Sequence, residues 1–194
     1  MKTNTKKKAQ KPTEAGGATQ KILNVINRLF GLGTKSDSGF VSPEAFSWVQ
    51  EVEARAHLIA HEVRSLLAHR ENVPAFQEVS ARQAMLSQDQ RWKTFFFHVY
   101  GQCVPEAIQL CPETANALKL IPNMKTAMFS IMEPGMEIPA HKGPYKGVLR
   151  YQLALLIPST DPEVCGIRVG GELRGWTPGK SMVFDDTLEH EAWN

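Results

Sequence analysis

TAMFSIM, at residues 126–132, is the first of four short apolar runs that decide the fold of this chain. The other three are VLRYQLALLIP (148–158), CGIRVGG (165–171) and SMVFDD (181–186). Glycine and proline residues lie between them, and short apolar runs separated by such turn signals are typical of an antiparallel β-barrel or jelly roll. Gly170 and Gly171 predict a hairpin turn between IRV and ELRGW. The sequence therefore predicts a β core over residues 124–194.

Two histidines flank these runs. His141 precedes the run that starts at Val148, and His190 follows residues 181–184, so both are expected to project from strand ends toward one cavity. Neutral imidazole nitrogens suit Fe(II), and two of them leave coordination positions open. A facial iron site usually adds a carboxylate two residues after the first histidine, but Gly143 stands there. The residues predict either a two-histidine site completed by water and co-substrate, or a cavity that binds no redox metal.

Asp185 and Asp186 lie close before His190 and are candidates for the missing oxygen ligand. An Asp-Asp pair after a strand is more often a turn, or a hydrogen-bond acceptor that orients a histidine. We expect one of these two structural roles rather than direct binding of a metal.

The region before the β core predicts helices. Ser42, with Pro43 at the first helical position, starts a helix that is expected to run to about Arg70. His57 and His61 have the spacing of a helical metal pair, but the glutamate of the zinc-protease motif H-E-x-x-H is absent, so we expect surface or packing histidines. The apolar stripe of this helix is Phe46, Val49, Val52, Ala56, Ile59, Val63 and Leu66.

Two further elements are expected before residue 124. A shorter helix is predicted over Pro112 to Leu120. WKTFFFHVYG, residues 92–101, predicts a strand with alternating faces. One face would carry Thr94, Phe96 and His98, and the other Phe95, Phe97 and Val99.

The N-terminal residues differ in composition from the rest. Residues 1–21 are polar and rich in lysine, so they cannot bury enough apolar surface to offset their ordering entropy, and a disordered basic tail is expected. A solvated tail is the simpler role, with weak contact to an acidic partner or an anionic membrane surface as the alternative. Residues 22–41 predict a short amphipathic helix and a linker. The helix would dock on the domain or lie on a membrane surface, and docking is the simpler expectation.

Composition sets the class of protein. The chain has 194 residues, 42% of them hydrophobic and 22% charged, with a formal net charge of +2. These values are ordinary for a soluble globular domain and give no case for nucleic-acid binding. The sequence has no secretory signal or apolar run of membrane-spanning length, and its three cysteines form no C-x-x-C pair. A cytoplasmic location is therefore expected.

Several stretches taken together resemble one known family. They are MKTAMFSIMEPGMEIPAHKGPYKGVLRYQLALLIP (124–158), WTPGKSMVFDDTLEHEAWN (176–194), WKTFFFHVYGQCVPE (92–106) and CPETANAL (111–118). They resemble the aspartyl/asparaginyl β-hydroxylase family, which includes bacterial lipid A hydroxylases. The likeness is strong from residue 92 onward and weaker before it. It implies a hydroxylase-like domain at residues 42–194, with a helical flank and first strands at 42–123 and the β-barrel at 124–194.

The resemblance also implies a fold and a chemistry. The family has a double-stranded β-helix of the cupin type and uses Fe(II), 2-oxoglutarate and O₂. Its members bind iron with two histidines and have glycine in place of the carboxylate, which is the pattern of His141, Gly143 and His190. By position, Ser130 and Arg150 correspond to residues that contact the carboxylates of 2-oxoglutarate. An arginine fork and a serine hydroxyl are suitable donors for a carboxylate.

Two departures from the family pattern carry expectations of their own. Gln152 stands where many relatives have a histidine that binds the co-substrate, and its amide can still donate a hydrogen bond. Relatives continue past HEAWN into another strand, which carries an arginine for the distal carboxylate. Because this sequence stops at Asn194, we expect a barrel that lacks its last strand, either as a fragment of a longer protein or as a truncated and inactive product.

The expected function is that of an Fe(II)- and 2-oxoglutarate-dependent dioxygenase. It would hydroxylate a C–H bond of a peptide Asp or Asn side chain, of an acyl chain or of a small acid. A non-catalytic cupin-like binding module is the main alternative, and a cupin enzyme with another divalent metal is a third. The sequence does not identify the substrate or the oligomeric state.

Overall fold

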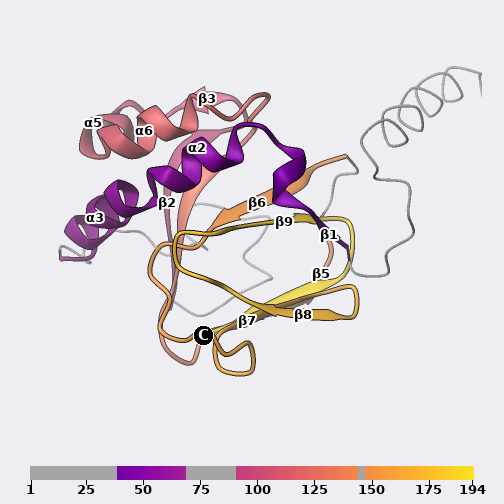
Figure 1. The fold of residues 1–194 in the computed structure, drawn as a ribbon. Helices are drawn as coiled ribbons and strands as arrows, with labels where there is room; N and C mark the ends of the chain where they lie inside the picture. The colour runs from indigo at the N-terminus through magenta and orange to yellow at the C-terminus, as the bar shows by residue number, and fades with distance from the viewer. Residues whose placement is uncertain (1–38, 69–90, 144–146) are drawn as a thin grey trace, which may run out of the picture. The chain divides into compact units, whose positions relative to one another are not determined.

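Antiparallel strands predominate in the part of the chain that the structure, a computed structural model, describes (Figure 1): residues 39–68, 91–143 and 147–194. These residues belong to one unit, Ser36–Asn194. The basic tail and the amphipathic helix expected near the N-terminus lie outside the described residues. Their roles and the domain boundaries stay predictions.

The strands form three sheets, and every strand pair is antiparallel. The four-stranded sheet has the order β5 (Glu137–His141), β10 (His190–Trp193), β7 (Gly166–Val169) and β8 (Glu172–Gly175). One three-stranded sheet has the order β1 (Phe40–Val41), β9 (Ser181–Asp185) and β6 (Leu149–Leu153). The other has the order β3 (Gln102–Cys103), β2 (Trp92–Val99) and β4 (Ala127–Met132). All four apolar runs that predict the β core contribute strands.

The hairpin between β7 and β8 follows its prediction. Val169 pairs with Glu172, so Gly170 and Gly171 form the two-residue loop. Gly170 has a φ of +63°, a conformation that glycine adopts without steric cost.

The helical segment after residue 42 differs from its prediction. The prediction of one continuous helix to Arg70 is wrong. The chain instead forms a 3-10 turn, η1 (Pro43–Ala45), and then two α-helices, α2 (Val49–Ala54) and α3 (Ala56–Leu67). Arg55 ends α2 and precedes α3, with a backbone near the bridge region (φ −91°, ψ −4°) that interrupts the helical ladder. Five residues of the predicted stripe are buried, namely Val49, Val52, Ala56, Ile59 and Val63; Ala60 is buried as well, and Phe46 and Leu66 are partly exposed.

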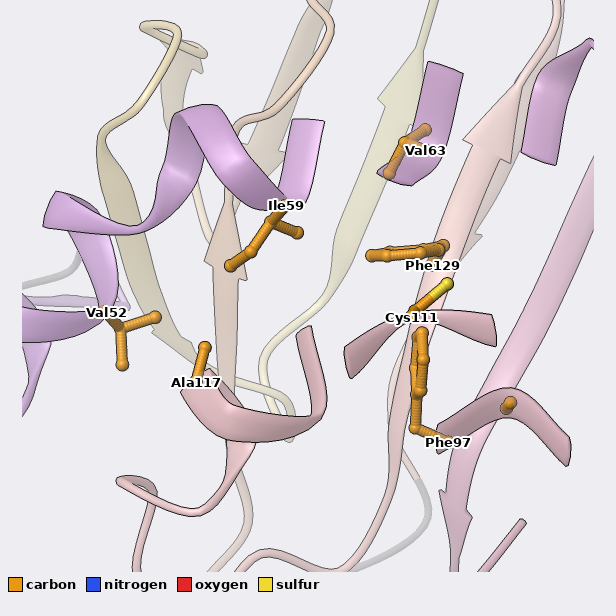
Figure 2. Packing of buried hydrophobic residues seen from close by; sticks show 8 residues of the cluster. Val52, Ile59, Val63, Phe97, Cys111, Ala117 and Phe129 are labelled. Carbon is orange, nitrogen blue, oxygen red and sulfur yellow. The ribbon is translucent and has the colours of Figure 1, made fainter. Parts of the chain in front are cut away.

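Two short helices follow β3. The predicted second helix is present as α6 (Pro112–Leu118) and ends two residues early, whereas α5 (Pro105–Leu110) was not predicted. Both begin with proline and have a glutamate in the first turn, which are helix-start signals. These helices and α3 enclose one buried cluster with β2 and β4 (Figure 2). Its buried members are Val52, Ile59, Val63, Phe97, Ala107, Cys111, Ala117 and Phe129.

Strand β2 separates two apolar layers. Phe95 and Phe97 pack in the helix-side cluster, whereas Trp92 and Phe96 pack with Met136 on the other face, in agreement with the predicted alternation. A bulge lies between Phe96 and His98 in the pairing with β4. Both faces of this sheet are therefore covered.

The inner face of the four-stranded sheet packs against β9. Ile167, Val169 and Ala192 form a buried cluster there with Met182 and Phe184. In Figure 1 the four-stranded sheet lies on the side of β6 and β9 opposite the helices. The region between these two layers, which the side chains of this cluster fill, is called the inner space below. Within the described ranges, no helix combines the length and apolar character needed to cross a membrane.

Candidate iron and co-substrate site

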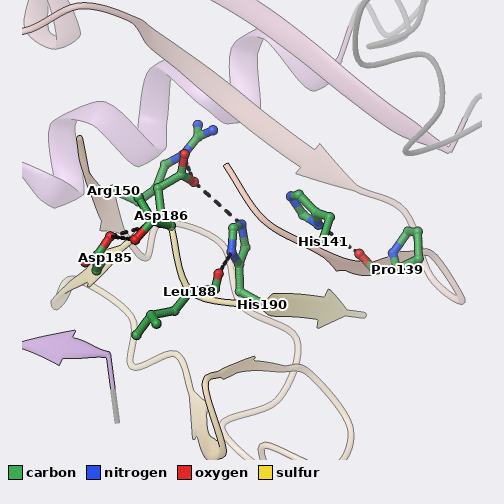
Figure 3. A network of polar contacts seen from close by, with 8 residues as sticks. Pro139, His141, Arg150, Asp185, Asp186, Leu188 and His190 are labelled. Atoms are coloured by element: carbon green, nitrogen blue, oxygen red, sulfur yellow. Dashed lines mark hydrogen bonds and ion pairs between the residues drawn. The ribbon is translucent and has the colours of Figure 1, made fainter. Parts of the chain in front are cut away.

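The two predicted metal ligands lie side by side. His141 ends β5, His190 begins β10, and the two residues are direct partners in the sheet. Their ring centroids are 4.2 Å apart. Figure 3 shows the two imidazole rings next to each other. His190 is buried at 7% exposure, whereas His141 is partly exposed. Sheet pairing thus brings together two residues that are 49 positions apart in the sequence.

Backbone hydrogen bonds fix both imidazoles in the same way. Nδ1 of His141 lies 2.8 Å from the carbonyl oxygen of Pro139, and Nδ1 of His190 lies 2.8 Å from that of Leu188. A carbonyl oxygen can only accept, so each Nδ1 carries the proton and each Nε2 keeps its lone pair. Such bonds to a carbonyl are the usual way in which a protein orients a metal-binding histidine.

The electrostatic surroundings keep His190 neutral. Burial lowers the pKa of His190, and the electrostatic interactions with His141 and Arg150 lower it further. The hydrogen bond to Leu188 and the carboxylate of Asp186 act in the opposite direction but do not cancel the shift. A neutral imidazole is the form that binds a metal ion.

Asp186 is the buried carboxylate of the site. It is 3% exposed, and its Oδ1 lies 3.6 Å from Nε2 of His190 and accepts a 2.7 Å hydrogen bond from Nε of Arg150 (Figure 3). Its backbone oxygen accepts a 2.7 Å bond from the N–H of Gly143. The sequence favours a turn or an acceptor that orients a histidine for such a residue, but the Asp186 carboxylate accepts from Arg150, whereas the imidazole of His190 is oriented by the carbonyl of Leu188.

Asp185 closes a turn, which is one of the two roles expected for the Asp185–Asp186 pair. Its Oδ1 accepts hydrogen bonds from the backbone N–H and the hydroxyl of Thr187, which closes the turn after β9. The carboxylate is thus occupied by the turn, not by the histidine pair.

Two predicted co-substrate residues lie on one face of β6. Arg150 pairs across the sheet with Phe184, and Gln152 pairs with Met182. Direct partners in an antiparallel sheet have side chains on the same face. Since Phe184 and Met182 belong to the inner cluster, Arg150 and Gln152 both face the inner space. Oε1 of Gln152 accepts a 3.0 Å hydrogen bond from the indole of Trp176.

Ser130, the third predicted co-substrate residue, lies on β4. It is the direct partner of Thr94, and its hydroxyl accepts a 2.9 Å hydrogen bond from the indole of Trp92. Trp92 packs with Met136 and Ile138, and Ile138 in turn touches the inner cluster that surrounds Phe184. Ser130 therefore lies on the face of β4 that contacts Trp92, but it is exposed, and no contact between it and the histidines is found among the described residues.

The structure thus places His190 and Arg150 beside Asp186, with His141 next to His190, and puts Gln152 on the same face of β6 as Arg150, whereas Ser130 is an exposed residue of β4. Residues 39–68, 91–143 and 147–194 contain no group of three or more His, Cys, Asp and Glu side chains arranged to hold a metal. His57 and His61 are exposed on α3, as expected of surface histidines. Trp92 and Trp176 were not predicted as hydrogen-bond partners of Ser130 and Gln152, since the pairing of an indole with a residue on a distant strand leaves no local signal.

Comparisons with known proteins identify the family of this chain. The model of the family "Aspartyl/Asparaginyl beta-hydroxylase" matches residues 53–194. An ornithine lipid ester-linked acyl 2-hydroxylase from Rhizobium tropici is 43% identical over 149 residues, which cover 77% of this chain and 53% of that protein. The human aspartyl/asparaginyl beta-hydroxylase is 35% identical over 107 residues, which cover 53% of this chain and 14% of that protein.

A third relative, the mouse aspartate beta-hydroxylase domain-containing protein 2, is 33% identical over 112 residues, which cover 53% of this chain and 31% of that protein. The chain thus spans about half the length of the Rhizobium relative and a smaller share of the other two. The family model covers well over half of the chain and includes both histidines. The chain belongs to the aspartyl/asparaginyl β-hydroxylase family.

Proposed function

We propose that this chain is an Fe(II)- and 2-oxoglutarate-dependent hydroxylase that acts on the acyl chain of a lipid. The observation that carries the proposal is the histidine pair, in which backbone carbonyls fix both Nδ1 atoms and leave both Nε2 atoms as electron-pair donors. Family membership implies dependence on Fe(II) and 2-oxoglutarate and a double-stranded β-helix fold. The three antiparallel sheets are compatible with that fold.

The residues of the site fit this metal and co-substrate. Two imidazoles with free Nε2 atoms suit Fe(II), and residue 143, a glycine, supplies no third ligand. Once bound, iron and 2-oxoglutarate would supply the oxidising power for insertion of an oxygen atom from O₂ into a C–H bond. His141 and His190 would hold the metal. The donors Ser130, Arg150 and Gln152 would hold the carboxylates of the co-substrate.

Asp186 would hold Arg150 in place beside the histidine pair. Its carboxylate balances the guanidinium of Arg150 and lies near Nε2 of His190, so it can accept a hydrogen bond from a group bound there. The apolar side chain of Phe184, whose ring lies 5.2 Å from that of His190, would help to exclude water.

An acyl chain is the substrate that the comparisons favour. The Rhizobium relative is named for hydroxylation at position 2 of an ester-linked acyl chain of ornithine lipid, and it covers more of this chain than the relatives named for aspartyl residues. A peptide Asp or Asn side chain and a small acid are the other substrate classes to be tested. A cytoplasmic location and a weak membrane-surface contact of the basic N-terminus remain part of the proposal.

The first test is an anaerobic titration of the purified chain with Fe(II) and 2-oxoglutarate, followed by the visible charge-transfer band of the chelate. We expect a saturable band that is lost in His141→Ala and His190→Ala and retained in His57→Ala, whose imidazole is exposed on α3. A folded parent protein that gives no band would favour the non-catalytic binding module. A band that needs neither His141 nor His190 would place the site elsewhere.

The second test concerns the substrate. The iron-loaded chain is incubated with ornithine lipid, 2-oxoglutarate and O₂, and the lipid is analysed by mass spectrometry. We expect addition of one oxygen atom to an acyl chain, together with one succinate per product. Hydroxylation of a peptide offered in parallel, with an unchanged lipid, would contradict the acyl-chain proposal and leave the co-substrate chemistry intact.

A further inference from the structure

The turn between β2 and β3 carries the most exposed large apolar side chain of the described ranges. Val99 pairs with Gln102, so Tyr100 and Gly101 form a two-residue loop. Tyr100 is 75% exposed, whereas the other large hydrophobic side chains that reach the surface are exposed at 63% or less. Among the described residues, the Tyr100 side chain has no hydrogen-bond partner and no neighbouring ring. The tyrosine therefore contributes nothing to the core.

The backbone of this tyrosine is unfavourable for its residue type. Tyr100 has a φ of +49° and Gly101 a φ of +83°, both positive as in a type I′ loop. Asparagine or glycine usually fills the first position of such a loop, because a bulky side chain at positive φ is strained. No packing contact of Tyr100 offsets this strain. A strained residue without a structural reason indicates a function for its side chain.

A second turn adjoins the first one. The backbone N–H of Gly101 donates a 2.9 Å hydrogen bond to the carbonyl oxygen of Lys125, in the segment that precedes β4. The side chain of Lys125 is exposed and that of Met124 is partly exposed. The two turns together, residues 100–101 and 122–125, are called the tip surface below.

The tip surface is basic. Neither residues 92–105 nor residues 114–132 contain an aspartate or a glutamate, and their charged residues are Lys93, Lys119 and Lys125. Lys93 forms an ion pair at the opposite end of β2. Within the described ranges, the ammonium group of Lys125 has no carboxylate partner. An exposed aromatic ring and an unpaired cation thus lie on adjoining turns.

This combination of side chains fits the interface of an anionic membrane. Tyrosine is enriched at the level of the lipid headgroups, because its ring is apolar and its hydroxyl is polar. A lysine near the surface is attracted by anionic headgroups. A soluble acidic ligand would need the lysine alone and would give no reason for a strained, protruding ring. The bilayer accounts for both residues.

We propose that the tip surface docks the chain on an anionic lipid bilayer, with Tyr100 at the level of the headgroups and Lys125 beside lipid phosphates. This inference rests on the proposed function, because the acyl chain of a membrane lipid is the substrate there. It adds a docking surface on the folded domain to the contact expected of the basic N-terminus. Docking brings the enzyme to its substrate and takes no part in the chemistry.

The test measures binding of the full chain to vesicles by sedimentation. The vesicles contain phosphatidylglycerol and phosphatidylcholine, and vesicles of phosphatidylcholine alone should bind less protein. Tyr100→Asn and Lys125→Gln should each weaken binding to the anionic vesicles by roughly three- to tenfold. Val164→Asn is the matched control, because Val164 is 55% exposed but lies in the loop before β7. Its binding should stay within about twofold of the parent.

Both tip variants are chosen so that they fold. Asparagine tolerates a positive φ, so Tyr100→Asn should melt at the same temperature as the parent or higher. Lys125→Gln keeps the backbone carbonyl that accepts from Gly101. Weaker vesicle binding by these variants therefore reports the loss of a surface contact and not a loss of structure.

Three results would overturn the inference. The first is a parent protein that does not bind anionic vesicles. The second is equal binding by the parent and both tip variants, which would assign the membrane contact to the lysines of residues 1–21. The third is a dimer in analytical ultracentrifugation that Tyr100→Asn dissociates, because the tyrosine would then contact a second copy of the chain.

Activity on dispersed lipid separates docking from the proposed function. Ornithine lipid in detergent micelles needs no docking to a bilayer, so both tip variants should hydroxylate it at the parent rate. Their rate on ornithine lipid in anionic vesicles should fall with their vesicle binding. A parent that is active on micelles but does not bind vesicles contradicts docking alone. A parent that is inactive on micelles contradicts the proposed function.

Discussion

The carboxylate of Asp186 occupies the space that a side chain on residue 143 would need. A Cβ atom added to Gly143 would lie 1.8 Å from Oδ2 and 2.3 Å from Cγ of Asp186. The glycine at the position of the usual third iron ligand thus has a local structural cause. It lets a carboxylate from the turn after β9 approach the histidine pair.

Gly143→Ala is therefore expected to destabilise the protein and to disturb the site. Asp186 would have to move, and its contact with Arg150 and its proximity to His190 would be lost with it. We expect a decrease of about 3 kcal/mol in the free energy of unfolding, as for an overpacked core. Urea denaturation measures the loss, and the Fe(II) titration of the same variant should show weaker binding.

Gly171→Ala is the control for this variant. It lies in the hairpin between β7 and β8, and a Cβ there would meet nothing within 4 Å. Its free energy of unfolding should stay within about 0.5 kcal/mol of the parent value. Equal effects of the two substitutions would contradict the steric argument at Gly143.

Glu62→Ala should weaken the attachment of α6 to α3. The Glu62 carboxylate accepts hydrogen bonds from the backbone N–H groups of Glu113 and Thr114, at 2.7 and 2.9 Å, and from the Thr114 hydroxyl at 2.6 Å. It caps the start of α6 from a neighbouring helix, because Cys111 makes no side-chain cap. Loss of this cap should cost about 2 kcal/mol of unfolding free energy in urea denaturation.

Glu51→Ala provides the comparison. Glu51 forms an exposed i,i+4 ion pair with Arg55 on the same helical segment, and its side chain is 58% exposed. Such a pair contributes less than about 0.5 kcal/mol. If Glu62→Ala were as mild as Glu51→Ala, the three hydrogen bonds would not stabilise α6.

The sequence predicted the strands because their signals are local. Apolar runs with turn residues between them specify short antiparallel strands, and Gly170–Gly171 specifies its hairpin. The histidine pair was predictable for the same reason, since both residues flank such runs. Strands β1, β3, β5 and β10 were missed, because β1 and β3 have two residues each and β5 and β10, which carry the histidines, contain no apolar run.

The remaining features depend on contacts between distant residues. The break at Arg55 follows from how α2 and α3 pack, because helix propensity alone favours continuation through arginine. The position of Asp186 beside Gly143 and Arg150 requires the sheet register of β6 and β9. The indole donors Trp92 and Trp176 likewise depend on which strands become neighbours. A single sequence contains no short-range pattern for these pairings.

Glu53 gives a prediction for the pH dependence of stability. Burial raises the pKa of this carboxyl, but hydrogen bonds from Lys180 and Ser181 outweigh burial and lower it below its ordinary value of 4.5. A carboxyl with a depressed folded-state pKa stabilises the protein fully above its unfolded-state pKa. This contribution is then lost as the pH falls from about 4.5 through the lower folded-state value.

Glu53→Gln should therefore flatten the pH profile of stability on the acid side. The parent and the variant are compared by thermal unfolding between about pH 3 and pH 7, the range in which carboxylates titrate. The difference in Tm between them should be largest near neutral pH and should shrink toward the acid end. A difference that does not change with pH would show that the charge of Glu53 does not stabilise α2 against β9.

Arg150→Lys tests the geometry of the co-substrate contact. Arg150 contacts Asp186 through Nε, at 2.7 Å, so its two terminal nitrogens remain able to bind a carboxylate as well. A lysine has a single nitrogen on a flexible stem and cannot reproduce both contacts in this planar arrangement. We expect the Kd for 2-oxoglutarate to rise by about tenfold or more, with a much smaller change in the free energy of unfolding.

Arg168→Lys is the matched substitution on the outer face of the four-stranded sheet. Arg168 pairs there with Glu191, on the face opposite Ile167 and Val169, and both charged side chains are partly exposed. This variant should bind 2-oxoglutarate as the parent does. If Arg150→Lys also bound 2-oxoglutarate normally, the terminal nitrogens of Arg150 would not contact the co-substrate. The carboxylate contact would then have to come from Ser130 and Gln152.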